Sequence, residues 1–183
     1  MGEDRVVNGV NTTELKKSIA QFQQDAGLAK FKFRVRNRWL GGGHSRTTIK
    51  EFHGAGQEHR TESEGHVIDA DEPEILLGKD AGANPVEHLL NALVTCLTGA
   101  MAYHAAARGI VIEELESEVE GDIDLRGFLG LTDEVRNGYQ NIRITFKVKS
   151  EGTEEKLREC AFFSPVFDTV TNGTKVAVKI EKK

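Results

Sequence analysis

Apolar and polar positions repeat with the period of a helix in some segments of the chain and with the period of a strand in others. Asn11 stands three residues before Glu14 in a capping-box pattern, and an apolar helical stripe follows that ends at Gly27. The stripe consists of Leu15, Ile19 and Phe22. We therefore predict an amphipathic helix of about four turns, with residues 1–10 frayed ahead of it.

Between Lys30 and Trp39 the period changes to two. The apolar set is Phe31, Phe33, Val35 and Trp39, and the opposite set is Lys30, Lys32, Arg34, Arg36 and Arg38. This pattern predicts a half-buried strand with a basic outer face. Glycines 41–43 then turn the chain toward two further strands, at 47–53 and 66–70, and the three strands together predict an antiparallel meander.

The segment from Asn84 to Gly109 predicts a long central helix. Asn84 can cap it, and Pro85 lies in the first turn, where a missing N–H group costs nothing. Apolar residues cover more than half of its circumference, namely Leu89, Leu90, Leu93, Val94, Leu97, Ala100 and Met101. We expect a helix this apolar to be covered on several sides, by the sheet and, in an oligomer, by a second subunit.

After the central helix the period returns to two, in a strand with an acidic outer face. The apolar set is Leu115, Val119, Ile123 and Leu125, and the acidic set is Glu114, Glu116, Glu118, Glu120, Asp122 and Asp124. Three interpretations are open for this strand and the basic strand at 30–38. Both faces are solvated, or the two strands pair in one sheet or across a dimer, or they line a groove for charged substrates.

The last third of the chain predicts a strand, a helix and a closing strand. The strand at 141–149 has Ile142, Ile144, Phe146 and Val148 on its inner face. Thr153 caps a helix that runs to about Phe163, and residues 174–180 form the closing strand. The predicted order is helix, three strands, long helix, two strands, helix and strand, which indicates an α+β fold.

Composition narrows the class of protein. The 183 residues suit one compact domain or two closely packed halves, and we place a single domain at residues 30–183 after a helical extension at 1–29. A net charge of -5 argues against nucleic-acid and anionic-membrane binding. No apolar run approaches the roughly 18 residues of a membrane span, and the first residues lack a signal-peptide pattern, so we expect a soluble, cytoplasmic protein. Two cysteines without a CxxC pattern give no support to a metal site or a cofactor.

The sulfur of Cys96 is the candidate reactive atom, because a lone thiol on a central helix is either an inert packing group or the group that reacts. It lies about three turns into the helix, where the helix dipole has little effect, so activation needs an Arg or His from elsewhere. His88 and His104 stand eight residues to either side, about 12 Å along the axis. Neither reaches the sulfur from the same helix, nor joins it in a metal site. The glycines at 78 and 82 lack the P-loop pattern, and a turn is the simpler interpretation there than a phosphate site.

Several segments, taken in order, resemble the family of osmotically inducible protein C and organic hydroperoxide resistance proteins (OsmC/Ohr). They are the Asn84-Pro85 helix start with Cys96 twelve residues on, the Ala-Arg-Gly-Ile run at 107–110, the Asp-Ile-Asp-Leu-Arg-Gly run at 122–127 and the segment from Ser164 to Asn172. The resemblance covers about residues 30–181. It implies an OsmC-like fold, with antiparallel sheets packed on a long central helix, and an intertwined homodimer with active sites at the interface.

The resemblance also implies a chemistry. In the peroxidase members a Cys on the central helix reduces an organic hydroperoxide, a second Cys resolves the sulfenic acid, and a dithiol reductant reopens the disulfide. An Arg favours the thiolate, and a Glu holds the Arg. Cys96 matches the reactive position. The Glu position is Val86 here, and the neighbouring Glu87 is turned by about 100° on a helix.

The remaining positions match in part. The resolving position is Ala161, and Cys160 is its neighbour, so a disulfide to Cys96 requires the Cα atoms to come within about 7 Å. The alternative is that Cys160 is a packing or surface residue. Arg46 is the first candidate for the arginine and His44 the second, against the alternative of solvated turn residues. Arg126 suits an interface ion pair or a strand-end surface charge.

Two functions remain open at this point. In the first the protein is a thiol-dependent peroxidase, with Cys96 as nucleophile, Cys160 as resolving thiol, Arg46 as thiolate stabiliser and Glu87 as its carboxylate. In the second it is a non-catalytic OsmC-like dimer that binds a small apolar ligand or senses oxidation at the interface pocket. The two cysteines favour the first function, and Val86 and Ala161 favour the second.

Overall fold

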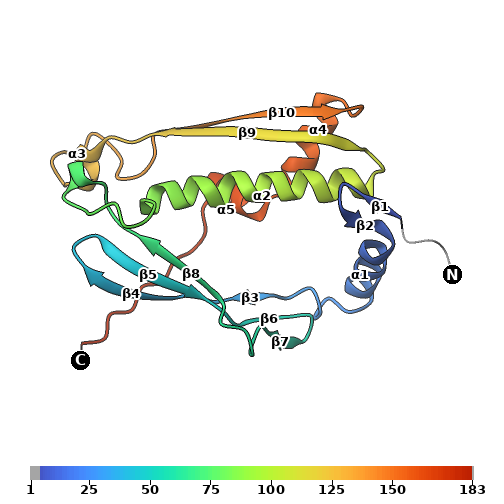
Figure 1. The fold of residues 1–183 in the computed structure, drawn as a ribbon, viewed down its shortest axis with the longest axis horizontal. Helices are drawn as coiled ribbons and strands as arrows, with labels where there is room; N and C mark the ends of the chain where they lie inside the picture. Colours follow the sequence, from blue (N-terminus) through green and yellow to red (C-terminus); the bar gives the residue numbers. More distant parts are fainter. Residues whose placement is uncertain (1–4, 183) are drawn as a thin grey trace. The chain divides into compact units, whose positions relative to one another are not determined.

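The computed structural model describes residues 5–182 and has a mixed α+β architecture, as the order of elements predicted (Figure 1). The chain forms two compact units. The first comprises Arg5 and residues 11–89, and the second comprises residues 6–10 and 90–182. Every strand pair with a defined register is antiparallel, which confirms the prediction of antiparallel sheets and a long helix.

The first unit begins with helix α1, Thr12–Gln24, and continues into two three-stranded sheets. The Oδ1 atom of Asn11 accepts hydrogen bonds from the amides of Thr13 and Glu14, at 3.0 and 3.1 Å, which confirms the predicted cap. One sheet has the order β3 (Lys32–Phe33), β6 (Phe52–Gly54), β7 (Gln57–His59). The other has the order β4 (Arg36–Gly41), β5 (His44–Ile49), β8 (His66–Ala70).

The half-buried strand predicted at 30–39 is wrong for the single chain. The segment divides into β3 and β4, which are edge strands of different sheets, and residues 31–40 are all exposed. Phe33 and Trp39 of the predicted inner face are 71% and 72% exposed. The apolar period is present in the sequence. Phe31 and Phe33 stack against Phe52 of β6, but within residues 5–182 this contact leaves the row exposed.

The second unit is built on helix α2, Pro85–Ala107, whose bounds agree with the prediction. Its buried residues Leu93, Leu97, Met101 and Ala105 recur every four positions and form one stripe. The inner faces of β9 (Ile112–Asp122) and β10 (Asn141–Ser150) pack against this stripe, and the β9–β10 ribbon runs along the helix in Figure 1. Among the described residues, α2 is the one helix that is long and apolar enough to cross a membrane. Its buried stripe forms part of the hydrophobic core of the second unit.

The acidic strand β9 pairs with β10 and not with the basic strand. The interpretation in which the acidic and basic strands pair in one sheet of the same chain is therefore wrong. The acidic side chains of β9 face basic side chains of β10. Arg143 bonds Glu120 at 2.7 Å and also Asp122, and Lys147 bonds Glu118 at 2.9 Å. Such exposed cross-strand pairs contribute about 0.2–1 kcal/mol each. A meeting of the acidic and basic strands across a dimer stays a prediction.

Three short helices complete the second unit. They are α3 (Leu125–Phe128), α4 (Glu154–Ala161), which Thr153 caps as predicted, and α5 (Pro165–Asn172). The sequence prediction missed α5, although Ser164 at its N-cap and Pro165 in its first turn are recognisable start signals. The closing strand predicted at 174–180 is wrong for the single chain, because residues 173–182 have no strand partner and are exposed.

The segment before α1 is ordered rather than frayed from Arg5 onward, while residues 1–4 lie outside the described part of the chain. Val6–Val7 and Val10–Asn11 form the hairpin of β1 and β2. Asn8 at its tip donates to the carbonyls of Ala102 and Ile110, at 3.4 and 3.0 Å, and accepts from the amide of Ile112 at 2.8 Å. One side chain therefore joins the end of α2 to the start of β9.

Replacement of Asn8 tests this joint. We expect Asn8→Ala to lower the free energy of unfolding by about 2 kcal/mol, because it leaves partly buried backbone groups without partners. Asn8→Asp keeps the acceptor for Ile112 and loses the two donated bonds, so its loss should be intermediate. Urea unfolding followed by circular dichroism measures both changes. A loss for Asn8→Ala within the error of the method would contradict the role assigned to this side chain.

Candidate functional site

The two cysteines lie in different environments of the second unit, and both are free thiols. Cys96 is half-buried on α2, beside the stripe that forms the core. Cys160 on α4 is fully buried, at 0% exposure, among the side chains of the core. Burial raises the pKa of the Cys160 thiol, which the positive charge of Arg108 partly opposes. Cys160 thus has the position of a packing residue, and Cys96 is the more accessible thiol.

Arg46 forms a two-point ion pair with Asp69 in the first unit. The register of β5 and β8 places the two residues directly opposite each other. Nε of Arg46 donates to Oδ1 of Asp69 at 2.7 Å, and Nη2 donates to Oδ2 at 2.9 Å. These bonds lower the pKa of Asp69 and raise the pKa of Arg46. The predicted arginine therefore has a carboxylate partner, and the partner comes from a neighbouring strand rather than from α2.

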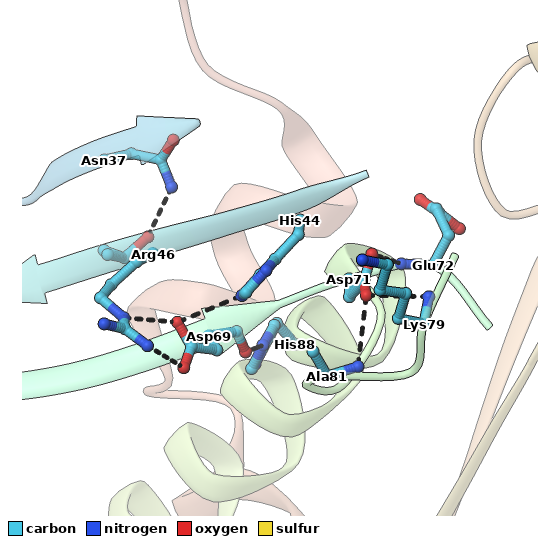
Figure 2. A network of polar contacts seen from close by, with 10 residues as sticks. Asn37, His44, Arg46, Asp69, Asp71, Glu72, Lys79, Ala81 and His88 are labelled. Atoms are coloured by element: carbon cyan, nitrogen blue, oxygen red, sulfur yellow. Dashed lines mark hydrogen bonds and ion pairs between the residues drawn. The ribbon is translucent and has the colours of Figure 1, made fainter. Parts of the chain in front are cut away.

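Two histidines approach the same aspartate, as Figure 2 shows. Nε2 of His44 lies 3.5 Å from Oδ1 of Asp69, and Nε2 of His88 lies 3.4 Å from the main-chain oxygen of Asp69. His88 is in the first turn of α2, so this contact links the helix start to β8. The sequence analysis singled out His44, Arg46 and His88 separately and missed Asp69. Its signal was weak, since an acid near the end of a five-residue strand is typical of a solvated face.

Glu87 caps the helix in the structure. Oδ1 of Asn84 accepts the amide of Val86 at 3.0 Å, and Oε2 of Glu87 accepts the amide of Asn84 at 2.8 Å. This reciprocal arrangement is a capping box. In the part of the chain that the structure describes, no ion pair joins Glu87 to Arg46. The structure therefore places these two predicted site residues in different hydrogen-bond sets.

The loop that leads into α2 is organised around a buried carboxylate. Asp71 is 2% exposed. Its carboxylate accepts hydrogen bonds from the backbone amides of Glu72, Lys79 and Ala81, at 2.9, 3.0 and 3.2 Å. A Cβ atom on Gly78 would come within 1.7 Å of the Glu72 carbonyl oxygen, so the loop requires glycine at that position. The amides of Lys79 and Ala81 are already bound to Asp71, which supports the interpretation of a turn and not of a phosphate site.

The other charged and aromatic candidates have local partners. His104 stacks on Phe163 at 4.0 Å between ring centroids, and burial followed by the charge of Arg108 lowers the pKa of His104. Arg126 is paired with Asp124. The bonds that the side chain and the backbone amide of Arg126 donate to Asp124 lower the pKa of Asp124 to about 2. Within residues 5–182 no cluster of three His, Cys, Asp or Glu residues has the geometry to hold a metal ion.

The four predicted site residues are thus divided between the two units. Arg46 and Glu87 belong to the first unit, and Cys96 and Cys160 belong to the second. The proximity of Arg46 to Cys96 therefore stays a prediction, as does a functional pair of Cys96 and Cys160. What the structure does assemble is a polar network, centred on Asp69, between the strand that carries Arg46 and the start of the helix that carries Cys96.

The Asp71 loop predicts a dependence of stability on pH. Burial raises the pKa of Asp71, but the three amide bonds together outweigh it, so the pKa lies below its ordinary value. The stabilisation is complete above the unfolded pKa of about 3.9 and is lost as the pH falls through the folded value. We expect Asp71→Asn to lower the melting temperature by several degrees at pH 7, and the difference from the wild type to shrink below about pH 4.

Asp80→Asn is the matched control, because it removes the same charge from an exposed position in the same loop. Scanning calorimetry between pH 3 and pH 7 measures both variants. Equal melting temperatures for the two variants at pH 7 would show that the Asp71 bonds do not hold the loop.

Comparison with known proteins places the chain in a family. The family model for OsmC-like proteins matches residues 78–179, which is more than half of the chain. The match begins in the Asp71 loop and includes α2 with Cys96 and α4 with Cys160. No curated protein matches the sequence.

Solved structures agree in fold. An OsmC-like protein from Mycoplasma pneumoniae has a TM-score of 0.58 at 17% identity, over 82% of this chain and 96% of the other. An OsmC-like protein from Vibrio cholerae has a TM-score of 0.57 at 13% identity, over 76% and 94%. An organic hydroperoxide resistance protein from Legionella pneumophila has a TM-score of 0.51 at 16% identity, over 78% and 90%. From the family match and this shared fold, the chain belongs to the OsmC-like protein family.

Proposed function

We propose that the protein acts in the cytoplasm as a thiol-dependent reductant of organic hydroperoxides, with Cys96 as the reacting residue. The observation that carries the proposal is the difference between the two thiols. Cys96 is half-buried on the central helix, whereas Cys160 is fully buried in the core. Family membership supports the same chemistry, and so does the fold shared with an organic hydroperoxide resistance protein of Legionella pneumophila.

The proposed reaction oxidises one sulfur by two electrons. The Cys96 thiolate attacks the terminal peroxide oxygen, the O–O bond breaks, and the alkoxide leaves and takes up a proton as the alcohol. Cys96 is left as a sulfenic acid. A thiolate of an external dithiol then attacks the Cys96 sulfur and releases water, and the second thiol of the reductant displaces Cys96 from the mixed disulfide. Cys160 has no step in this scheme, because its burial and raised pKa disfavour the thiolate.

Arg46 is the proposed source of positive charge for the Cys96 thiolate. Its bidentate bond to Asp69 engages Nε and Nη2, and Nη1 keeps its N–H donors for another acceptor. A positive charge within about 4–6 Å of a thiol favours the thiolate. His44, which shares the same carboxylate, is the second candidate.

The alternative function is a non-catalytic dimer that binds a small apolar ligand or senses oxidation at Cys96. Val86 favours it, because this position at the helix start carries no carboxylate and Glu87 is used in the capping box. In this case Cys96 is oxidised once and is not returned by a cycle of reduction. Turnover therefore separates the two functions.

Thiol counting with cumene hydroperoxide tests the proposal. We expect one equivalent of the peroxide to remove one reactive thiol per chain, and dimedone labelling with mass spectrometry to place the sulfenic acid at Cys96. Cys96→Ser should abolish the reaction, and Cys160→Ala should leave its rate within about twofold of the wild type. Dithiothreitol should restore the thiol and sustain turnover. A Cys96 that stays reduced at small peroxide excess rejects the proposal, and oxidation without turnover favours the sensor.

We also propose that the chain works as a homodimer. The support comes from apolar rows that a single chain leaves exposed, in β3 and β4 and in the C-terminal segment. The largest exposures in these rows are at Phe33, Val35, Trp39, Val176, Val178 and Ile180. An alternating apolar row is typical of a strand that packs on one face, so a second copy of the chain is the proposed cover.

The oligomeric state tests this second proposal. We expect light scattering after gel filtration to give twice the mass of the chain for the wild type. Val176→Asp combined with Val178→Asp should shift the mass toward the monomer, because each carboxylate would be buried without a partner. Thr174→Asp, an exposed neighbour in the same segment, is the control and should remain dimeric. A monomeric wild type at micromolar concentration would contradict the proposed dimer.

A further inference from the structure

An open cavity of about 430 Å³ lies in the first unit, against the sheet that β3, β6 and β7 form (Figure 1). Its lining consists of Lys32, Arg34, His53 and Glu58. Ligand pockets in proteins have volumes of roughly 300–1,000 Å³, so the cavity has room for a small molecule. All four lining side chains are charged or titratable, which distinguishes the cavity from an apolar groove.

The register of the three strands places the lining side chains on one face of the sheet. Lys32 of β3 is the cross-strand partner of His53 of β6, and His53 is the partner of Glu58 of β7. Arg34 follows Lys32 by two positions and reaches the same carboxylate. The next row of cross-strand partners lies on the opposite face, because side chains alternate along a strand. That row is Phe33, Phe52 and His59. The charged cavity is therefore separate from the aromatic face that the proposed dimer covers.

The cavity has an excess of positive charge. Nη2 of Arg34 donates to both oxygens of Glu58 at 2.7 Å, and these bonds lower the pKa of Glu58, so the carboxylate is ionised. The pair leaves the N–H groups of Nε and Nη1 of Arg34 without an acceptor among the described residues. Within residues 5–182 no carboxylate pairs with Lys32. One acid thus faces two cations, and a protonated His53 adds a third positive charge.

The sequence around the cavity adds to this charge. Residues 30–60 contain eight Lys and Arg residues and two acidic residues, although the net charge of the whole chain is -5. A basic region on an acidic protein attracts anions to one part of the surface and repels cations. The charges on the page therefore favour an anionic ligand over a metal ion.

We propose that this cavity binds a phosphate group, either as the free anion or as part of a small phosphorylated molecule. A phosphomonoester carries about -1.5 to -2 charges at pH 7 and has three acceptor oxygens. With His53 protonated, the lining has three positive groups and one carboxylate, so one dianion neutralises it. The ammonium of Lys32 and the remaining N–H groups of Arg34 supply donors for the oxygens. A carboxylate ligand has one charge and two oxygens and satisfies fewer of them. The inference does not depend on the proposed function of Cys96.

Calorimetric titration of the full-length protein tests the proposal at low ionic strength in a buffer without phosphate. The probes are glycerol 3-phosphate, inorganic phosphate and, as the carboxylate of similar size, glycerate. We expect one site per chain, with a Kd for at least one phosphate probe about tenfold below that for glycerate, because glycerate lacks the second charge. Tighter binding of glycerol 3-phosphate identifies a phosphorylated small molecule as the source, and tighter binding of inorganic phosphate identifies the free anion.

Arg36 provides a matched control for the contribution of Arg34. It pairs with Glu51 at 3.0 Å, much as Arg34 pairs with Glu58, but its side chain is 74% exposed, against 43% for Arg34, and it does not line the cavity. We expect Lys32→Gln and Arg34→Gln each to weaken phosphate binding about tenfold, and Arg36→Gln to leave the Kd within about twofold. Lys32→Gln breaks no ion pair among the described residues, so it tests the site even if Arg34→Gln disturbs the fold.

Three results would overturn the proposal. The first is the absence of saturable binding of both phosphate probes, and the second is binding of glycerate as tight as that of either phosphate. The third is an equal loss in Arg34→Gln, Lys32→Gln and Arg36→Gln, which would indicate general attraction by the basic region. NMR chemical-shift mapping locates the bound anion, and we expect the largest amide shifts at Lys32, His53 and Glu58. Shifts confined to other segments would contradict the assignment to this cavity.

Discussion

Burial of one stripe of α2 is the constraint on which the second unit depends. Leu93, Leu97, Met101 and Ala105 face β9, β10 and α4, and each large apolar side chain buried there contributes about 1.5–3 kcal/mol. A stripe with a spacing of four leaves the flanking positions of the helix less covered. Cys96 precedes Leu97 and is turned by about 100° from it, so the same packing that buries the core keeps this thiol half-buried.

The start of α2 shows how neighbouring carboxylates acquire different roles from their surroundings. Asp71 is enclosed by loop amides and holds the loop before the helix. Glu87 lies in the first turn and caps the helix. Asp69 lies on a strand opposite an arginine and forms an ion pair. Because these tasks are distributed over three residues, an arginine in this region can have a carboxylate partner although position 86 is valine.

Much of this arrangement was predictable from local patterns, and the remainder depends on contacts distant in sequence. The cap at Asn84, the end of α2 and the inner face of β10 were correctly predicted, because capping signals and periodicity are written in adjacent residues. The role of Asp69 was not, because the register of β5 with β8 brings it opposite Arg46 from 23 positions away. The burial of Cys160 also depends on the packing of α4 on the α2 stripe, which no local pattern gives.

Two segments that the sequence predicted as strands are exposed in the single chain, and both are exposed for the same physical reason. An alternating apolar row specifies a strand with one covered face, but it does not specify which chain provides the cover. Phe33 and Trp39 in the first unit, and Val176 and Val178 in the C-terminal segment, keep this alternation and remain exposed. A sequence that places apolar side chains at every second position in exposed segments incurs a cost in water that burial by another chain removes. The failed predictions of burial are therefore themselves an argument for association.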